Sequence, residues 1–299
     1  MISIIIPHLN QHEELEACLS SLDAQTLDRA LFEIIVVDNG SQVAPCDVIA
    51  RHSSARLLLE AKPGPGPARN NGTKSAAGDI LAFIDADCRA HPDWLRNIQT
   101  ALQSSSPKTI LGGDVRIWRD AQKDFTSIEA YESVFAYRFK LYIEQHGFSG
   151  TGNLAMFRRD FETIGPFAGI DIAEDMEWGQ RACALGFRFQ YVPDMIVFHP
   201  ARRSLQELYA KWDRQIHHYR NMAQGKRWWR YRWIARAFLI LGSPIIDSAT
   251  VFNSDRIEGL PARLKAIAVL CAIRAHRAFK MLSLLYGERS IVWNRDSGV

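Results

Sequence analysis

The amino-terminal part of the chain alternates short, continuously apolar runs with segments of helical spacing, a pattern typical of a sheet with helices packed on its faces. Apolar runs without alternation are typical of strands that are covered on both sides. The runs are ISIII, FEIIVV, ARLLL, ILAFI and TILGGDVRIW. Helical spacing lies over 13–24, 66–77 and 92–104, with Pro92 in the expected first turn. We therefore expect an α/β fold with a mostly parallel central sheet flanked by helices.

The pattern changes after Val115. A long helical stretch is expected over 125–145, followed by the glycine-rich SGTGNLAMF and a helix over 174–185. FRFQYVP and MIVFHP are expected strands, and from Ser204 onward the chain has helical patterning throughout.

Composition excludes several classes of protein. Hydrophobic residues make up 47% of the chain and charged residues 23%, which indicates a globular protein rather than a disordered one. The five cysteines lack CxxC spacing, which argues against a disulfide framework and a zinc site. MISIIIP has no basic flank and stops at Pro7, so a buried first strand is favoured over a secretory signal. We expect a reducing, cytoplasmic setting.

Polar or conformationally special residues follow three of the expected strands. They are Pro7 to Asn10, Asp38 to Ser41, and Asp85-Ala86-Asp87. The carboxyl ends of parallel strands share one edge of a sheet, where ligands bind. The three segments are therefore expected to lie side by side.

The strongest local signal is ILAFIDADCRAHPDWL, an apolar strand that ends in Asp-x-Asp. Alternation places Asp85 and Asp87 on the same side of an extended segment, where both can face one cation. Carboxylate oxygens are ligands that Mg²⁺ prefers. A solvated turn is the common alternative, but the position at a strand end favours a metal site.

A second signal is KPGPGPARNNGTKSAAGD. Gly64 and Gly66 loosen the backbone before a helix whose amino end can receive an anion, and Arg69 offers a planar fork to a diphosphate. Taken alone, the segment fits an ordinary loop and helix better. It lacks the ending of a P-loop, and no GxGxxG follows the first strand, which argues against a dinucleotide-binding dehydrogenase.

Asp38 and the pair Glu174 and Asp175 can each be interpreted in two ways. Asp38 can bind a ribose or base edge, or it can cap the next turn, and capping is favoured for the residue alone. Glu174 and Asp175 suit the first turn of a helix by charge, but a carboxylate there can also deprotonate a hydroxyl.

Taken together, these segments resemble family 2 glycosyltransferases, with the motifs in the right order over roughly the first 200 residues. The resemblance lies in SIIIPHLNQHEELEACLSSL, FEIIVVDNGS, GPARNNGTKSAAGDILAFIDADCRAHPDWL, GTGNLAMFRRDFETIGPF, AEDMEWGQRACALGFRFQYVP and VFHP. It implies a GT-A fold with a catalytic domain over 1–203 and a helical region over 204–299. Within the catalytic domain, 1–118 would bind the nucleotide-sugar and 119–203 the acceptor.

The resemblance also implies a role for individual residues. The nucleoside-diphosphate sugar would be bound by Pro7, Asn10, Asp38, Arg69, Asp85, Ala86 and Asp87. Mg²⁺ or Mn²⁺ would be bound by Asp85, Asp87 and His199, although His199 alone fits a structural histidine. Asp175 would be the general base, assisted by Glu174, and the acceptor would be lined by Gly152, Asn153, Glu174 and Trp178.

The implied reaction is a single displacement with inversion, onto a hydroxyl of a glycan or lipid-linked acceptor, in cell-surface polysaccharide or glycolipid synthesis. Leu9 stands where the family usually has an aromatic residue that stacks on uracil, which argues against a UDP donor. The chain has no QxxRW-type motif, which favours transfer of one sugar. The rivals are a nucleotidyltransferase, which would need a glycine-rich loop after the first strand, and a non-enzymatic sugar-nucleotide-binding or membrane scaffold.

The carboxyl-terminal segment KRWWRYRWIARAFLILGSPIID combines cations and tryptophans with an apolar stretch. This mixture is typical of a bilayer interface, and Pro244 and Asp247 argue against a spanning helix. An amphipathic helix over 262–286 fits the same role. We expect peripheral contact at the inner face of the membrane. The alternatives are packing on the core or dimerisation, and no motif indicates nucleic-acid binding.

Overall fold

The computed structural model describes residues 1–120, 122–169 and 174–286. The chain divides into two compact units. The first, called the sheet unit, comprises Met1–Arg116 and Tyr137–Pro200. The second, called the helical unit, comprises Ile117–Ala136 and the chain from Ala201 onward.

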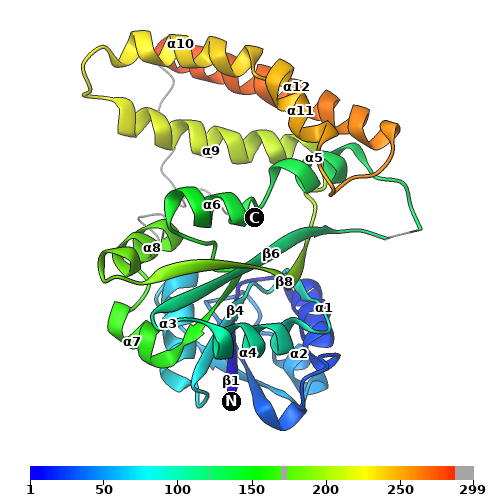
Figure 1. Cartoon of the computed structure of the whole chain (residues 1–299), viewed down its shortest axis with the longest axis vertical. Coiled ribbons are helices and arrows are strands. Elements are labelled where there is room, and N and C mark those ends of the chain that lie inside the picture. The colour runs from blue at the N-terminus through cyan, green and yellow to red at the C-terminus, as the bar shows by residue number, and fades with distance from the viewer. Residues whose placement is uncertain (121, 170–173, 287–299) are drawn as a thin grey trace. The chain divides into compact units, whose positions relative to one another are not determined.

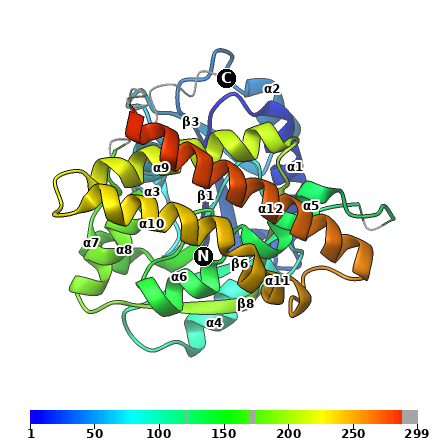
Figure 2. The same cartoon turned by 90° about the horizontal axis from the view of Figure 1, so that it is seen from above.

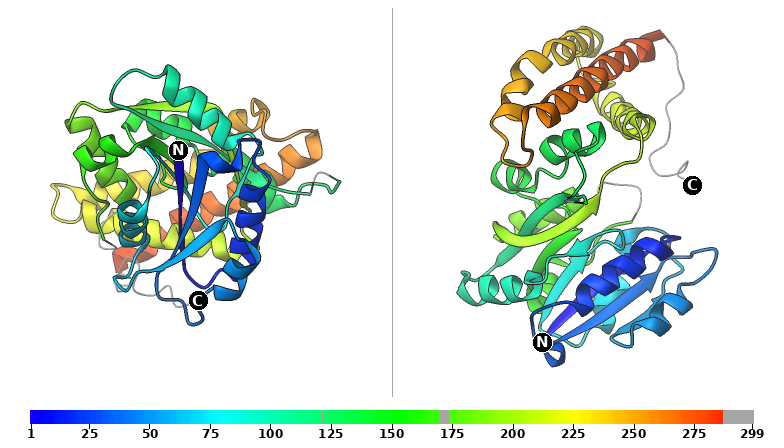
Figure 3. Two further views of the ribbon diagram at one scale, coloured as in Figure 1. Left: turned by 90° about the horizontal axis from the view of Figure 1, so that it is seen from below. Right: turned by 90° about the vertical axis from the view of Figure 1, so that its right-hand side faces the viewer.

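The sheet has eight strands in the order β3-β2-β1-β4-β7-β6-β8-β5. They are β1 Ile2–His8, β2 Phe32–Asp38, β3 Ala55–Leu59, β4 Ile80–Ile84, β5 Arg89–Ala90, β6 Thr109–Trp118, β7 Asn153–Phe157 and β8 Arg188–Pro200. Figure 1 labels β1, β4, β6 and β8. Strands β1 to β4 pair in parallel, and β1 lies between β2 and β4 (Figure 3). Strand β7 runs antiparallel to β4 and β6, and β5 runs antiparallel to β8. The expected α/β fold is confirmed, with a mixed sheet rather than a mostly parallel one.

Strand β1 shows why the first strands are continuously apolar. Ile2, Ile4 and Ile6 belong to one buried cluster, which includes side chains of α1 and α4. Ile5 belongs to the opposite cluster, which includes Ala68 of α3. Both faces of the strand are therefore covered, so every position favours an apolar side chain.

The helices of the sheet unit are α1 His12–Asp23, α2 Cys46–Arg51, α3 Pro65–Ser75, α4 Trp94–Ser104, α6 Phe139–His146, α7 Arg158–Ile164 and α8 Glu174–Ala184, with a 3₁₀ turn over Arg29–Leu31. Helices α1, α3, α4 and α8 lie close to the expected positions, whereas α2 and α7 were not predicted. The prediction for Pro92 was wrong, because Asp93 is the N-cap of α4 and Pro92 lies just outside the helix. The helix expected over 125–145 is interrupted at Tyr137, whose φ of 47° is left-handed and cannot continue a helix.

The helical unit consists of α5 Ser127–Phe135, α9 Leu205–Ala223, α10 Trp229–Gly242, α11 Pro244–Phe252 and α12 Leu260–Ser283, with a 3₁₀ turn over Leu284–Tyr286. Helix α12 packs against α5, α9, α10 and α11 (Figure 2). In the described part of the chain, no single helix is long and apolar enough to cross a bilayer. Helices α10 and α11 meet that requirement only together, with a bend of 44° between them.

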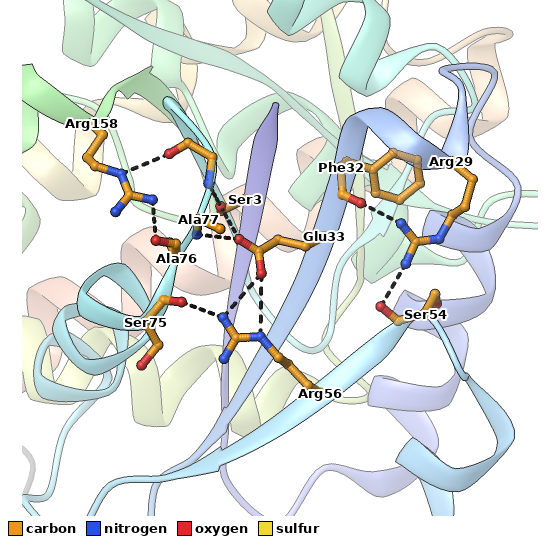
Figure 4. A network of polar contacts seen from close by, with 11 residues as sticks. Ser3, Arg29, Phe32, Glu33, Ser54, Arg56, Ser75, Ala76, Ala77 and Arg158 are labelled. Atoms are coloured by element: carbon orange, nitrogen blue, oxygen red, sulfur yellow. Dashed lines mark hydrogen bonds and ion pairs between the residues drawn. The ribbon is translucent and has the colours of Figure 1, made fainter.

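A polar network ties the amino ends of the strands together (Figure 4). Glu33 of β2 accepts hydrogen bonds from Ser3 Oγ at 2.6 Å, from the Ala77 N–H at 2.5 Å and from Arg56 Nη2 at 3.1 Å. Burial opposes the charge of Glu33, but these donors outweigh it and lower its pKa. Arg158 donates to backbone carbonyls of the segment that joins α3 to β4. These charges stabilise the end of the sheet opposite the candidate site.

Candidate active site

The carboxyl ends of three neighbouring parallel strands form the candidate site. His8 and Asp38, the last residues of β1 and β2, are in register, and β4 lies on the other side of β1. Asp85 follows the last residue of β4 directly. The prediction that the three polar segments lie side by side is confirmed.

Asp38 is held by two partners that fix its orientation. Its Oδ1 accepts a hydrogen bond from Ser41 Oγ at 2.5 Å and lies 2.9 Å from His8 Nδ1, while its Oδ2 accepts from the Ser41 N–H at 3.2 Å. Asp38 therefore caps the turn after β2. Burial opposes its charge, but the hydrogen bonds of Ser41 and His8 outweigh burial and lower its pKa.

His8 lies in the segment Pro7 to Asn10, which was predicted to lie at this edge, but no role was predicted for it. Its side chain is buried, and its Nε2 accepts a hydrogen bond from the Gln11 N–H at 3.2 Å. Since Nε2 accepts, the proton of the neutral ring lies on Nδ1 and is donated to Asp38. Burial lowers the pKa of His8 and keeps the ring neutral. A polar residue at the end of a strand, in register with Asp38, is the signal that would have identified it.

The loops around Asp38 are fixed by two asparagines. Asn10 has a left-handed φ of 53°, and its Oδ1 accepts a hydrogen bond from the Gln42 N–H at 2.9 Å. Asn39 donates through Nδ2 to the Lys62 carbonyl at 2.8 Å and accepts at Oδ1 from the Gly64 N–H at 2.6 Å. Asn39, for which likewise no role was predicted, thus connects the end of β2 to the glycine-rich loop.

Arg69 of α3 is the central cation of the site. Its side chain is 4% exposed, and its Nη2 donates to Asp85 Oδ1 at 2.6 Å. Its Nη1 donates to Glu174 Oε1 of α8. Arg69 therefore joins a carboxylate from the end of β4 to a carboxylate from the start of α8.

Two glycines leave room for these carboxylates. A Cβ at Gly152 would lie 2.5 Å from Asp85 Oδ2, and a Cβ at Gly66 would lie 2.6 Å from Glu174 Oε2. Both distances are too short for a real contact, so any side chain at either position would displace an acid of the site. A Cβ at Gly66 would lie even closer to the Ala168 carbonyl, so this glycine allows the approach of both that backbone segment and Glu174.

Asp175 and Glu174 begin α8, and burial raises the pKa of both. The Met176 N–H at 2.8 Å and the charge of Arg69 only partly offset burial for Asp175. A carboxyl group with a raised pKa is a stronger base than an exposed one, as general-base catalysis requires.

Asp87 pairs with His199, which lies at the end of β8. His199 Nε2 lies 3.2 Å from Asp87 Oδ2, and its Nδ1 lies 2.6 Å from the Pro200 carbonyl. Burial alone would lower the pKa of His199, but the hydrogen bond and charge of Asp87 raise it. The Tyr137 ring, which was not predicted, lies 4.6 Å from the His199 ring.

The predicted metal ligands offer two carboxylates and an imidazole, a donor set that suits Mn²⁺ or Mg²⁺. Among the described residues, however, no three histidine, cysteine or acidic side chains are gathered closely enough to hold a metal ion. Asp85 is instead turned to Arg69, and Asp87 to His199. One oxygen of each carboxylate, Asp85 Oδ1 and Asp87 Oδ2, is thus paired with a basic side chain.

Three predicted site residues have buried side chains. Asn153 Oδ1 accepts a hydrogen bond from Trp94 Nε1 at 2.9 Å. Asn153 Nδ2 donates to the Asp114 and Met195 carbonyls, both at 2.8 Å, so the side-chain amide is engaged within the protein rather than with an acceptor sugar. Trp178 is 1% exposed in an aromatic cluster. The prediction that Asn153 and Trp178 line an acceptor pocket is therefore corrected, because both side chains belong to the core. The third, Ala86, is also buried, and only its backbone can contact a donor.

Pro7 lies in β1, in register with Val37, and has no N–H to offer a ligand. Leu9, directly after β1, is 49% exposed. The start of the candidate site therefore presents an aliphatic side chain rather than an aromatic ring.

Residues 3–165 match the model of the family described as glycosyl transferase family 2. Glycosyltransferase AglE of Haloferax volcanii is 33% identical over 208 residues, which cover 67% of this chain and 67% of that protein. The amylovoran biosynthesis glycosyltransferase AmsB of Erwinia amylovora is 28% identical over 202 residues, which cover 62% of this chain and 65% of that protein. The chain thus spans about two thirds of the length of each relative.

One solved structure supports the fold. The mannosyltransferase PcManGT of Pyrobaculum calidifontis, in complex with GDP-Man and Mn²⁺, superposes with a TM-score of 0.58 over 96% of this chain and 88% of that chain. The identity is 18%, so the likeness concerns the fold. The expected GT-A fold with a helical carboxyl-terminal region is confirmed.

Proposed function

Because the chain belongs to glycosyl transferase family 2 and is a glycosyltransferase, we propose that it moves one sugar, with inversion, from a nucleoside-diphosphate sugar to a hydroxyl group. The observation that carries the proposal is the cluster in which Arg69 joins Asp85 to Glu174, next to Asp175. Acids from the end of β4 and the start of α8 meet there, so one bound donor can lie near both the Arg69 guanidinium and the Asp175 carboxylate.

Asp175 is the proposed base. It takes the proton of the acceptor hydroxyl while that oxygen forms a bond to the anomeric carbon, and the bond from that carbon to the diphosphate oxygen breaks. The nucleoside diphosphate leaves with the electron pair. The raised pKa of Asp175, caused by burial, supports this role.

The donor is proposed to bind along the ends of the strands. Asp38, fixed by His8 and Ser41, offers acceptor oxygens to the nucleoside. Asn10, Pro7 and the backbone of Ala86 would shape this end of the site.

The residues proposed to hold Mg²⁺ or Mn²⁺ are Asp85, Asp87 and His199. When bound, such an ion would neutralise charge that develops on the diphosphate. Asp85 could offer Oδ2, since its contact with Arg69 is through Oδ1, whereas His199 would have to lose its proton to offer Nε2. Arg69 would add positive charge beside the diphosphate.

The acceptor is proposed to be a glycan or a lipid-linked acceptor, and the pathway to be polysaccharide or glycoconjugate synthesis. The similarity to AmsB, an amylovoran biosynthesis glycosyltransferase, supports the pathway. Gly152 and Glu174 remain the proposed acceptor contacts, because Gly152 lies against Asp85 and Glu174 pairs with Arg69.

We also propose that the helical unit contacts the cytoplasmic face of a membrane. Large apolar side chains of α10 and α11 are exposed, at 60%, 74%, 86% and 78% for Phe238, Leu239, Ile245 and Ile246. Exposed apolar side chains beside clustered cations are typical of an interfacial segment. Flotation with anionic vesicles tests this, and absence of flotation at low and high salt would contradict it.

The catalytic proposal is tested with a panel of nucleotide sugars, by calorimetry with Mn²⁺ and with a chelator, and by donor turnover. Asp175→Asn is expected to lower turnover by ~10²–10⁴-fold, because general-base assistance is lost, with donor affinity nearly unchanged. Glu177→Gln, in the same helical turn but paired with Arg181, is the matched control. Turnover of Asp175→Asn close to that of Glu177→Gln would remove Asp175 from the role of base.

A further inference from the structure

A pocket of about 440 Å³ lies between α9 and α10, within the helical unit. It is lined by three cations and three aromatic rings, namely Lys226, Arg232, Arg236, Tyr219, Trp229 and Trp233. None of these residues belongs to the candidate active site. The volume lies within the range of sites for small molecules, about 300–1,000 Å³.

The sequence of the two helices explains why the pocket exists. Residues 229, 232, 233 and 236 recur at helical spacing and share one face of α10. Further along the helices, Ala237 and Ile240 pack with Ile216 in an apolar cluster. Toward the turn that joins α9 to α10, cations replace apolar residues on this face, so the space between the helices is not filled. Trp233 fixes one wall, because its indole N–H donates to the Met281 carbonyl at 2.7 Å.

The charge of the pocket is not balanced nearby in the sequence. No aspartate or glutamate occurs from Arg214 to Ile246. The acids on either side of this segment are already paired, Asp213 with His276 and Asp247 with Arg274, both at 2.8 Å. Within the described ranges, Lys226, Arg232 and Arg236 therefore have no carboxylate partner.

Arg236 is oriented by an aromatic neighbour. Its guanidinium lies over the Tyr219 ring, 5.0 Å from the ring centre. A cation held in this way keeps its N–H donors available, since stacking uses the face of the guanidinium and not its edges. Lys226 and Arg232 are exposed at the same pocket, so the three cations can act on one anion.

We infer that this pocket binds a phosphate or diphosphate group, with the cations on its oxygens and the aromatic rings against the apolar part of the ligand. Guanidinium groups bind phosphate through paired, charge-assisted hydrogen bonds. Two sources supply this chemistry, a phospholipid headgroup or a soluble phosphate compound. The pocket shares no residue with the proposed donor site, and the inference does not depend on glycosyl transfer.

The test uses the full-length protein and two probes. Tryptophan fluorescence follows titration with inorganic phosphate and pyrophosphate, because Trp229 and Trp233 line the pocket. Flotation follows binding to phosphatidylcholine vesicles with and without phosphatidic acid. Arg232→Gln/Arg236→Gln removes two pocket cations, and Arg214→Gln/Arg227→Gln removes the same charge from exposed positions outside the pocket.

The pocket variant is expected to lose about tenfold or more in affinity, as for charge-assisted hydrogen bonds, with less than about a twofold loss in the control. If the pocket variant, but not the control, loses affinity for phosphate or pyrophosphate, the ligand is a soluble phosphate compound. If the pocket variant, but not the control, loses binding only to vesicles with phosphatidic acid, the ligand is a lipid headgroup. Equal losses in both variants, or no binding of either probe, would overturn the inference. Donor hydrolysis should be the same in both variants, so a failure here is distinct from a failure of the proposed catalysis.

Discussion

Asp85 packs directly against the backbone of Gly152, so closely that a Cβ at position 152 would lie 2.5 Å from Asp85 Oδ2. The two residues continue neighbouring antiparallel strands, since Ile84 of β4 is in register with Asn153 of β7. The geometry of the sheet therefore positions this carboxylate, and the missing side chain lets it reach Arg69.

Gly152→Ala is expected to weaken Mn²⁺-dependent donor binding by at least about tenfold, because Asp85 must move and small displacements at a site are costly. Calorimetric titration with the donor measures the effect. Gly242→Ala is the control, since a Cβ there meets nothing within 4 Å. Equal affinities of the two variants would contradict the proposed role of Gly152.

Arg69→Gln is expected to move the acid limb of the kcat/KM profile to higher pH. The positive charge of Arg69 lowers the pKa of Asp175, while burial raises it. Without Arg69 the pKa rises further, so a larger fraction of the base is protonated and inactive at low pH. The loss of activity should thus be larger at about pH 6 than at about pH 8. A uniform loss at all pH values, in a variant that is folded by circular dichroism, would exclude this electrostatic role.

His8→Leu is expected to weaken binding of the nucleoside diphosphate by about tenfold, because Asp38 loses a hydrogen bond that fixes its orientation. His8→Asn can place an amide N–H near the position of Nδ1 and should retain more affinity. Calorimetry with the nucleotide compares the two. If both variants bind as well as the wild type, His8 has no part in positioning Asp38.

His52 makes the folding stability depend on pH. Its Nδ1 lies 2.6 Å from Asp23 Oδ2 and its Nε2 lies 3.0 Å from Glu16 Oε1. Burial opposes the charge of His52, but both acids outweigh it and raise its pKa. This stabilisation is complete below the unfolded-state pKa of about 6.5 and is lost as the pH rises through the raised folded-state value.

His52→Gln should therefore lower the urea midpoint more at about pH 6 than at about pH 9, where wild-type His52 is neutral. His146→Gln, at an exposed histidine, is the control. An equal decrease in midpoint at both pH values would show that the charge of His52 does not contribute.

Strands β1, β2 and β4 could be predicted because burial on both faces makes them continuously apolar. The short strand β7 was not predicted, since NLAMF follows a glycine-rich segment and pairs with strands distant in sequence. The interruption between α5 and α6 carries no proline or glycine in the sequence. Tyr137 adopts its left-handed φ in the tertiary structure, where its ring lies against His199.

In the site, the positions of Asp38 and Asp85 followed from the ends of their strands. The pairing of Asp85 with Arg69, and of Arg69 with Glu174, did not, because helical spacing does not say which residue of α3 or α8 reaches across the site. Trp178 and Asn153 illustrate the limit most clearly. Tryptophan and asparagine are both suited to a sugar pocket, but here the Trp178 ring and the Asn153 amide are buried in the core.

The path of the chain has a practical consequence for making shorter forms of the protein. The polypeptide leaves the sheet unit after Arg116, returns at Tyr137 and leaves again after Pro200. A truncation at Pro200 would not isolate a minimal enzyme, because α5 would remain without α12, its packing partner. Buried residues of α5 such as Ala130 and Val134 would then be exposed to solvent, and insolubility of such a fragment would say nothing about catalysis.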